Sequence, residues 1–112
     1  MNIRTQVLLW AAQRITAAVL ALCVVVHLVT MIYAVRHGLS AAEILGRTRG
    51  NYAWLAFYAT FVLAVAIHAP IGARTILAEM LGWRGALVDA ALLVLGLMLA
   101  LWGWRAVLAV FG

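Results

Sequence analysis

The sequence has few charged residues and contains no lysine. Only 10% of its 112 residues are charged, with three acidic residues and eight basic ones, all of them arginine. Hydrophobic residues make up 69% of the chain, and its mean hydropathy is +1.14. A soluble domain of this size needs a polar surface larger than its core. This composition therefore excludes a soluble domain.

Other absences exclude further classes of protein. Cys23 is the single cysteine, so neither a disulfide framework nor a cysteine-based metal site is expected. The chain also lacks a dinucleotide-binding fingerprint and the cysteines of an iron–sulfur cluster. The formal net charge is +5, but the arginines lie at the ends of apolar segments and form no basic face. They are typical of interfacial anchors, and no nucleic-acid partner is expected.

Three apolar segments are long enough to cross a membrane. They run approximately over residues 15–35, 52–77 and 86–110, and roughly 20 helical residues cross a hydrocarbon core. A span must satisfy its own backbone hydrogen bonds in lipid, which favours helices. The sequence predicts an all-α membrane protein, a single transmembrane domain over residues 1–112 whose three transmembrane helices form part of a larger helix bundle. The first span is too long for a signal peptide and is expected to be retained.

The connections between the spans have recognisable signals. Residues 1–14 are expected to form a short amphipathic lead-in. Ser40 and Glu43 have the spacing of a capping box, which predicts a short surface helix in the first loop. The second loop, around residues 82–85, predicts a tight turn and therefore antiparallel second and third spans. Four arginines lie on each side, so charge does not decide the orientation.

Two histidines lie inside predicted spans, where ionisable side chains are rare and usually functional. His27 lies 13 residues after Arg14, about 20 Å along a helix. His68 lies six residues before Arg74, about 9 Å from the opposite side of the membrane. At these depths the two rings cannot share one metal ion. Each could be an interhelical hydrogen-bonding residue or an axial ligand of haem iron, whereas zinc would need further ligands at the same depth.

Two segments resemble a known family, the membrane cytochrome b subunit of succinate dehydrogenases and fumarate reductases. Gln13-Arg14-Ile15-Thr16 followed by His27 resembles the family's first helix, where a similar start precedes an axial haem histidine. The segment from His68 to Arg74, with the pattern H-x-x-x-G-x-R, resembles its second helix. The resemblance covers roughly residues 13–80.

The resemblance implies a function. The chain would be a haem b-binding membrane anchor subunit that passes electrons between an iron–sulfur subunit and membrane quinone. Succinate oxidation or fumarate reduction would take place on the flavoprotein partner, so this chain is expected to have no catalytic residue of its own. The family topology also implies a bacterial inner membrane with the N-terminus in the cytoplasm.

The resemblance also implies roles for individual residues. The axial ligands of haem iron would be His27 and His68. The arginines expected to bind haem propionates are Arg36 and Arg74, with Arg47 and Arg49 as further candidates near His27. The residues expected to contact quinone are Arg14, Thr16 and Glu43. Interfacial anchoring for the arginines, a helix-start cap for Thr16 and the capping box for Glu43 are the simpler interpretations.

The chain departs from the family in its number of spans. Two-haem members with a single membrane subunit use five spans, whereas single-haem members use two different three-span subunits. With three spans, His27 and His68 would each lack a partner ligand within the chain. A second three-span subunit, identical or homologous, is therefore expected. The alternatives are a haem-free membrane anchor or assembly subunit, a cytochrome b of another respiratory complex, and a small proton-relaying transporter.

Overall fold

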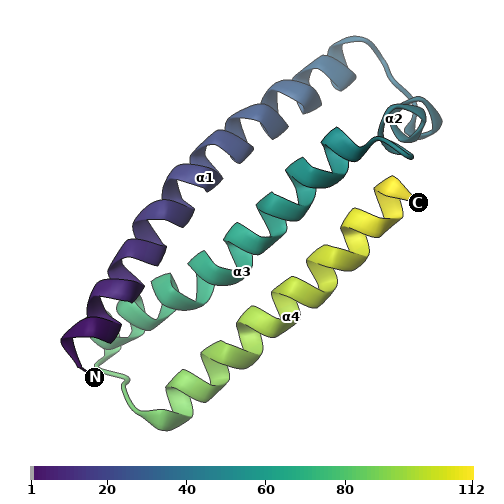
Figure 1. Cartoon of the computed structure of the whole chain (residues 1–112). Coiled ribbons are helices and arrows are strands. Elements are labelled where there is room, and N and C mark those ends of the chain that lie inside the picture. Colours follow the sequence, from purple (N-terminus) through teal and green to yellow (C-terminus); the bar gives the residue numbers. More distant parts are fainter. Residues whose placement is uncertain (1) are drawn as a thin grey trace.

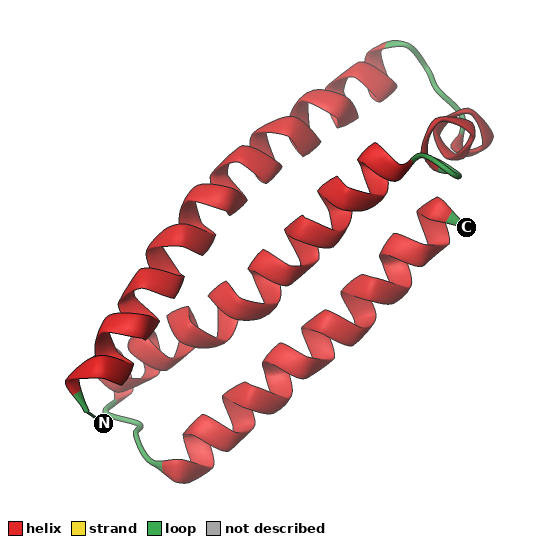
Figure 2. Cartoon of the chain, viewed as in Figure 1, coloured by secondary structure: helices red, strands yellow, loops and turns green. Residues whose placement is uncertain are grey.

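The structure is a computed structural model that describes residues 2–112, so Met1 of the predicted domain lies outside the described residues. The described residues form four helices, namely α1 (Ile3–Arg36), α2 (Ala41–Thr48), α3 (Tyr52–Leu81) and α4 (Ala86–Phe111). Residues 2–112 contain no strand (Figure 2). Three of the helices, α1, α3 and α4, are long and apolar enough to cross a membrane. The predicted fold class is confirmed.

The helices are longer than the predicted spans. The expected lead-in is continuous with the first span, because α1 already begins at Ile3 and runs for 34 residues. That length is about 51 Å, well beyond a hydrocarbon core of about 30 Å. The side chain of Asn2 caps the start of α1 by accepting a 2.8 Å hydrogen bond from the backbone N–H of Thr5. Both ends of α1 therefore extend into the interfacial regions.

The first loop is fastened to the end of α4. The predicted capping box is present, with Ser40 and the N3 residue Glu43 satisfying each other's backbone N–H groups at the start of α2. At the other end of α2, the hydroxyl of Thr48 donates a 2.7 Å hydrogen bond to the carbonyl of Val110. The backbone N–H of Gly50 bonds the carbonyl of Phe111 at 2.9 Å. These bonds satisfy carbonyl groups that the end of α4 would otherwise leave free.

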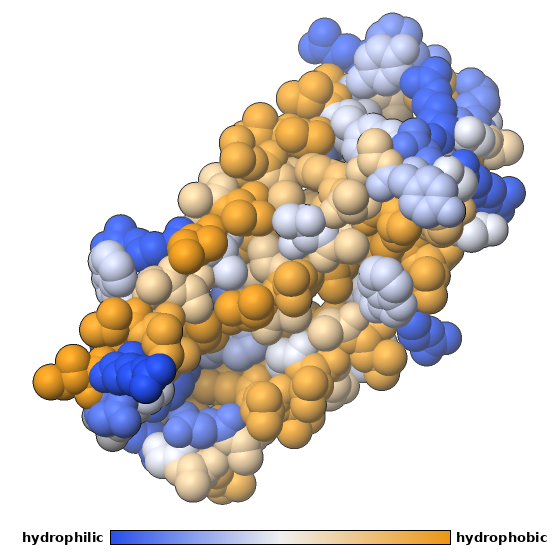
Figure 3. Space-filling model, viewed as in Figure 1, coloured by the Kyte–Doolittle hydropathy of each residue, from blue (hydrophilic) through white to orange (hydrophobic). Residues whose placement is uncertain are grey.

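The three long helices form an open layer with α3 in the middle (Figure 1). Helix α3 packs against both α1 and α4, which make no substantial contact with each other. Few side chains are buried within the chain, and many large apolar ones on the long helices are exposed. Figure 3 shows hydrophobic residues over the middle of the molecule and hydrophilic residues gathered at its two ends. This pattern suits a chain whose middle contacts lipid or other membrane helices.

Candidate functional site

Both intramembrane histidines face the interface between α1 and α3. The two helices run antiparallel, so that Thr16 of α1 lies beside His68 of α3, and His27 of α1 lies beside Tyr58 and Phe61 of α3. Thr16 and His27 are 11 residues apart on α1, which corresponds to about 16 Å along the helix axis. The two imidazoles therefore occupy different depths of one interface, as the sequence predicted.

A residue of α1 contacts the ring of His68 and fixes its orientation. Its Nδ1 lies 3.1 Å from the hydroxyl oxygen of Thr16, which is buried. Within residues 2–112, the other ring nitrogen, Nε2, takes part in no hydrogen bond. Gln13, about one turn before Thr16 on α1, lies close to Gly72 of α3, so this face of α1 packs against α3. The His68 ring consequently has a fixed orientation and one nitrogen that the described residues do not use.

The ring of His27 is held by aromatic packing. Its centroid lies 6.1 Å from that of Tyr58 and 5.9 Å from that of Phe61, and both pairs are edge-on. Its Nδ1 is buried and has no hydrogen-bond partner within the described residues. A buried polar atom without a partner is costly, and such atoms often mark the position of a ligand.

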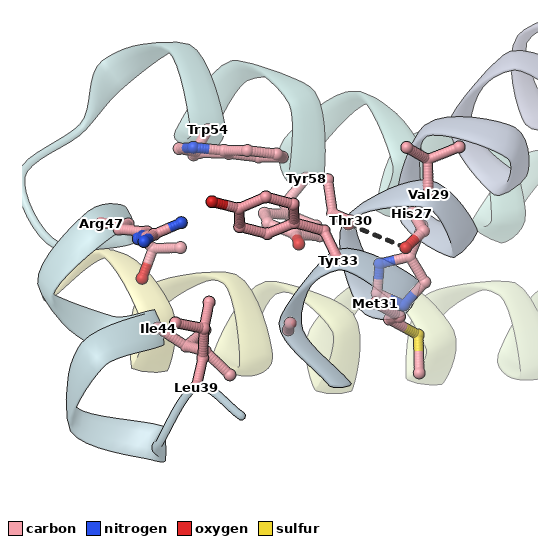
Figure 4. A pocket seen from close by; sticks show the side chains of 12 residues that line it. His27, Val29, Thr30, Met31, Tyr33, Leu39, Ile44, Arg47, Trp54 and Tyr58 are labelled. Atoms are coloured by element: carbon pink, nitrogen blue, oxygen red, sulfur yellow. Dashed lines mark hydrogen bonds between the residues drawn. The ribbon is translucent and has the colours of Figure 1, made fainter. Parts of the chain in front are cut away.

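A cavity of about 410 Å³ opens from His27 towards the first loop. We call it the first-loop cavity. Arg47 of α2 lies at one end and His27 at the other, with the rings of Tyr33, Trp54 and Tyr58 between them (Figure 4). The guanidinium carbon of Arg47 lies 5.5 Å from the ring centroid of Tyr33. The cavity thus has an aromatic lining, a cation at its mouth and an imidazole at its inner end.

A second cavity also reaches His27. It has a volume of about 450 Å³ and lies between α3 and α4, where it is lined by apolar groups that include Val62, Trp102 and Gly103. Each of the two cavities is within the size range of small-molecule sites. His27 and Tyr58 line both of these cavities.

A third cavity, the N-terminal groove, lies at the other end of the α1–α3 interface. It has a volume of about 360 Å³, and its lining includes Trp10, Gln13, Arg14 and Arg74. The guanidinium carbon of Arg14 lies 5.3 Å from the ring centroid of Trp10. The Oε1 of Gln13 is buried without a hydrogen-bond partner in the described chain. The groove offers guanidinium donors at the end of an apolar interface.

The structure brings some of the predicted residues together and separates others. Arg14 and Arg74 share the N-terminal groove, although the Nε of Arg74 also donates a 2.8 Å hydrogen bond to Asp89. Thr16 does not line that groove. Arg36 lies exposed in the last turn of α1 and lines none of the cavities described above, and Glu43 is engaged in the capping box.

Part of the aromatic lining was not predicted from the sequence. Trp54 and Tyr58 lie four residues apart, which places them on one face of α3. That spacing was a usable signal. Tyr33 carried no comparable signal, because its place in the first-loop cavity depends on where the first loop positions Arg47 of α2.

The chain matches the family model of the succinate dehydrogenase/fumarate reductase transmembrane subunit over residues 1–104. The match extends the resemblance seen in the sequence, which covered roughly residues 13–80, to most of the chain. No curated protein and no solved structure matches it.

Proposed function

Because the chain belongs to the family of succinate dehydrogenase/fumarate reductase transmembrane subunits, we propose that it binds haem b and passes electrons between the iron–sulfur subunit and membrane quinone. Family membership makes it a membrane anchor subunit of such a complex, with catalytic subunits as partners. The observation that supports the haem is the pair of imidazoles at two depths of one interface, each with a ring nitrogen that the described residues do not use.

The residues present fit a haem group. His27 combines a buried nitrogen without a partner and two adjoining cavities, and His68 combines a fixed ring with an unused Nε2. Imidazole is the common axial ligand of haem iron, and bound haem would supply reversible one-electron transfer. His27 and His68 would each bind haem iron through a ring nitrogen, and the aromatic walls beside His27 would exclude water from that ligand.

Arg47 is the best candidate to bind a haem propionate near His27. It lines the same cavity as His27, whereas Arg36, the arginine first expected there, does not. A guanidinium forms strong charge-assisted hydrogen bonds with a carboxylate. Arg74 is the corresponding candidate on the side of His68, because Asp89 occupies its Nε and its terminal nitrogens have no partner within residues 2–112.

Quinone would bind in the N-terminal groove. Arg14 would donate to a quinone oxygen there, and the side chain of Gln13 could add a second polar contact. Thr16 is less suited to this role than expected, since its hydroxyl is already engaged with Ala12 and His68. Glu43 lies at the opposite end of α1, so a role for it in accepting a quinol proton would require a second quinone site.

A second three-span subunit, identical or homologous, would complete the ligation. The open layer leaves faces of α1 and α4 uncovered, and a partner packed there could bring a histidine to each haem. Following the family topology, the N-terminus and the second loop would face the cytoplasm of a bacterium and the flavoprotein and iron–sulfur subunits. Electrons would then reach the His68 side before the His27 side.

The test is haem quantification in the complex purified through this chain, with a reduced-minus-oxidised spectrum. We expect b-type haem, with one haem per copy of the chain if both histidines are ligands in paired chains. His27→Gln and His68→Gln should each remove haem or alter its spectrum. His37→Gln is the matched control, because His37 is exposed at the end of α1. Absence of haem from the intact complex would contradict the proposal and favour a haem-free anchor.

A further inference from the structure

The hydroxyl of Thr16 is surrounded by three protein atoms. Its oxygen lies 2.7 Å from the carbonyl oxygen of Ala12, 3.2 Å from that of Gln13 and 3.1 Å from the Nδ1 of His68. The side chain is only 7% exposed, so no water replaces these partners. The arrangement of hydrogen atoms around this oxygen therefore determines what Thr16 does to the histidine.

The proton of the Thr16 hydroxyl goes to Ala12. A hydroxyl has one proton to donate, and carbonyl oxygens can only accept. The distance to Ala12 is the usual one for an O–H···O hydrogen bond, and the distance to Gln13 is longer than usual. With its proton engaged within α1, the Thr16 oxygen can offer His68 only a lone pair.

We infer that Thr16 is a positioning residue that accepts a hydrogen bond from the Nδ1–H of His68 and so holds the ring in the tautomer with an unprotonated Nε2. The separation of 3.1 Å is within the range of an N–H···O hydrogen bond. A metal-binding imidazole commonly donates its other N–H to such an acceptor, which fixes both tautomer and orientation. The link to haem rests on the proposed function, whereas the tautomer is a property of the chain alone.

His27 has no equivalent partner. Its Nδ1 is buried without a hydrogen bond in the described residues, and the nearest hydroxyl in sequence, that of Thr30, donates to the His27 backbone carbonyl. The two imidazoles of this interface therefore differ in their hydrogen bonding. His68 has its tautomer fixed before any ligand binds, whereas no residue described here fixes that of His27.

The tautomer can be measured without haem. The full chain, labelled with ¹⁵N-histidine and reconstituted in nanodiscs, would be studied by long-range ¹H–¹⁵N correlation spectra, with His68→Gln used to assign the signals. We expect His68 to show the Nδ1–H form in the wild type and in Thr16→Ser, which keeps the hydroxyl. In Thr16→Val we expect that form to lose its dominance. An Nε2–H form in the wild type would overturn the inference.

Thr60→Val provides a matched control. Thr60 of α3 donates a 2.7 Å hydrogen bond to the carbonyl of Ala56, the same bond within a helix that Thr16 makes, but within residues 2–112 it forms no hydrogen bond with a histidine. This substitution should leave the His68 spectrum unchanged. If a folded Thr16→Val variant also left the His68 spectrum unchanged, the inference would be overturned.

Haem binding gives a second readout in the complex. Removing such a supporting partner typically lowers metal-site affinity about 10- to 100-fold. We expect Thr16→Val to lower the haem affinity of the His68 site within that range, with Thr16→Ser close to the wild type. An unchanged affinity would contradict the role of Thr16. A wild-type complex without haem would contradict the proposed function, and the nanodisc spectra would still decide the tautomer.

Discussion

Gly96 of α4 lies against the carbonyl of Ala66 on α3. A Cβ atom at Gly96 would be 3.0 Å from that oxygen and 3.0 Å from Cγ of Pro70. Pro70 has no N–H and so cannot bond the carbonyl four residues earlier, which is that of Ala66. The absence of a side chain at Gly96 therefore lets α4 pack against the point where the α3 hydrogen-bond ladder is interrupted.

Gly96→Ala should weaken the packing of α4 on α3. The added methyl group would meet backbone and a proline ring, neither of which can move aside easily, and overpacking of this kind costs about 1–3 kcal/mol. The free energy of unfolding in mixed micelles would measure the effect. Gly46→Ala in α2 is the control, because nothing lies within 4 Å of a Cβ at that position. Equal stability of the two variants would contradict this account.

Thr48→Val should loosen the first loop from the end of α4. The variant keeps the shape of the side chain but loses the hydrogen bond to Val110, which is expected to contribute about 0.5–1.5 kcal/mol. Hydrogen exchange at the amide of Gly50, which bonds the neighbouring carbonyl of Phe111, should become faster. Thr48→Ser should retain slow exchange. Fast exchange in both variants would show that the hydroxyl is not the fastening group.

The spans and the first-loop cap could be predicted from local sequence. Long apolar runs identify transmembrane helices by length alone, and the capping box involves residues only three positions apart. The start of α1 was predicted less well, because Gln13 and Arg14 resemble an interfacial boundary although the helix passes straight through them. When a helix is longer than the membrane is thick, the apolar pattern marks the edge of the membrane and not the end of the helix.

The candidate ligands of the site could be predicted from the sequence, but the residues around them could not. His27 and His68 stand out because ionisable residues are rare inside spans. The bond between Thr16 and His68 joins residues 52 positions apart, so it depends on the register of α1 against α3. That register is set by packing along the whole interface. The position of Arg47 also depends on tertiary packing, because it lies on a separate short helix. In the sequence it was therefore no stronger a candidate than the neighbouring arginines.

Arg47→Gln should weaken haem binding on the His27 side and lower the midpoint potential of that haem. Removing a cation near a propionate favours the more positive ferric state, which is the oxidised form. Loss of a charge-assisted hydrogen bond costs about 1.5–3 kcal/mol, or roughly tenfold or more in affinity. Redox titration of the complex would measure the potential. Arg49→Gln, at an exposed arginine outside the first-loop cavity, should change neither quantity, and equal shifts in both variants would indicate a general charge effect.

Arg14→Gln should raise the KM for quinone about tenfold with little loss of haem. Its guanidinium lines the N-terminal groove beside Trp10 and Arg74, so the substitution removes a charged donor while the groove keeps its shape. Steady-state quinone reduction by the complex and a haem spectrum of the same sample would measure both effects. Arg4→Gln is the control, because Arg4 is exposed on the same end of α1 and does not line the groove. If both variants raised KM equally, the effect would come from the positive charge at this end of α1 and not from a contact in the groove. That result would contradict the assignment of the groove as the quinone site.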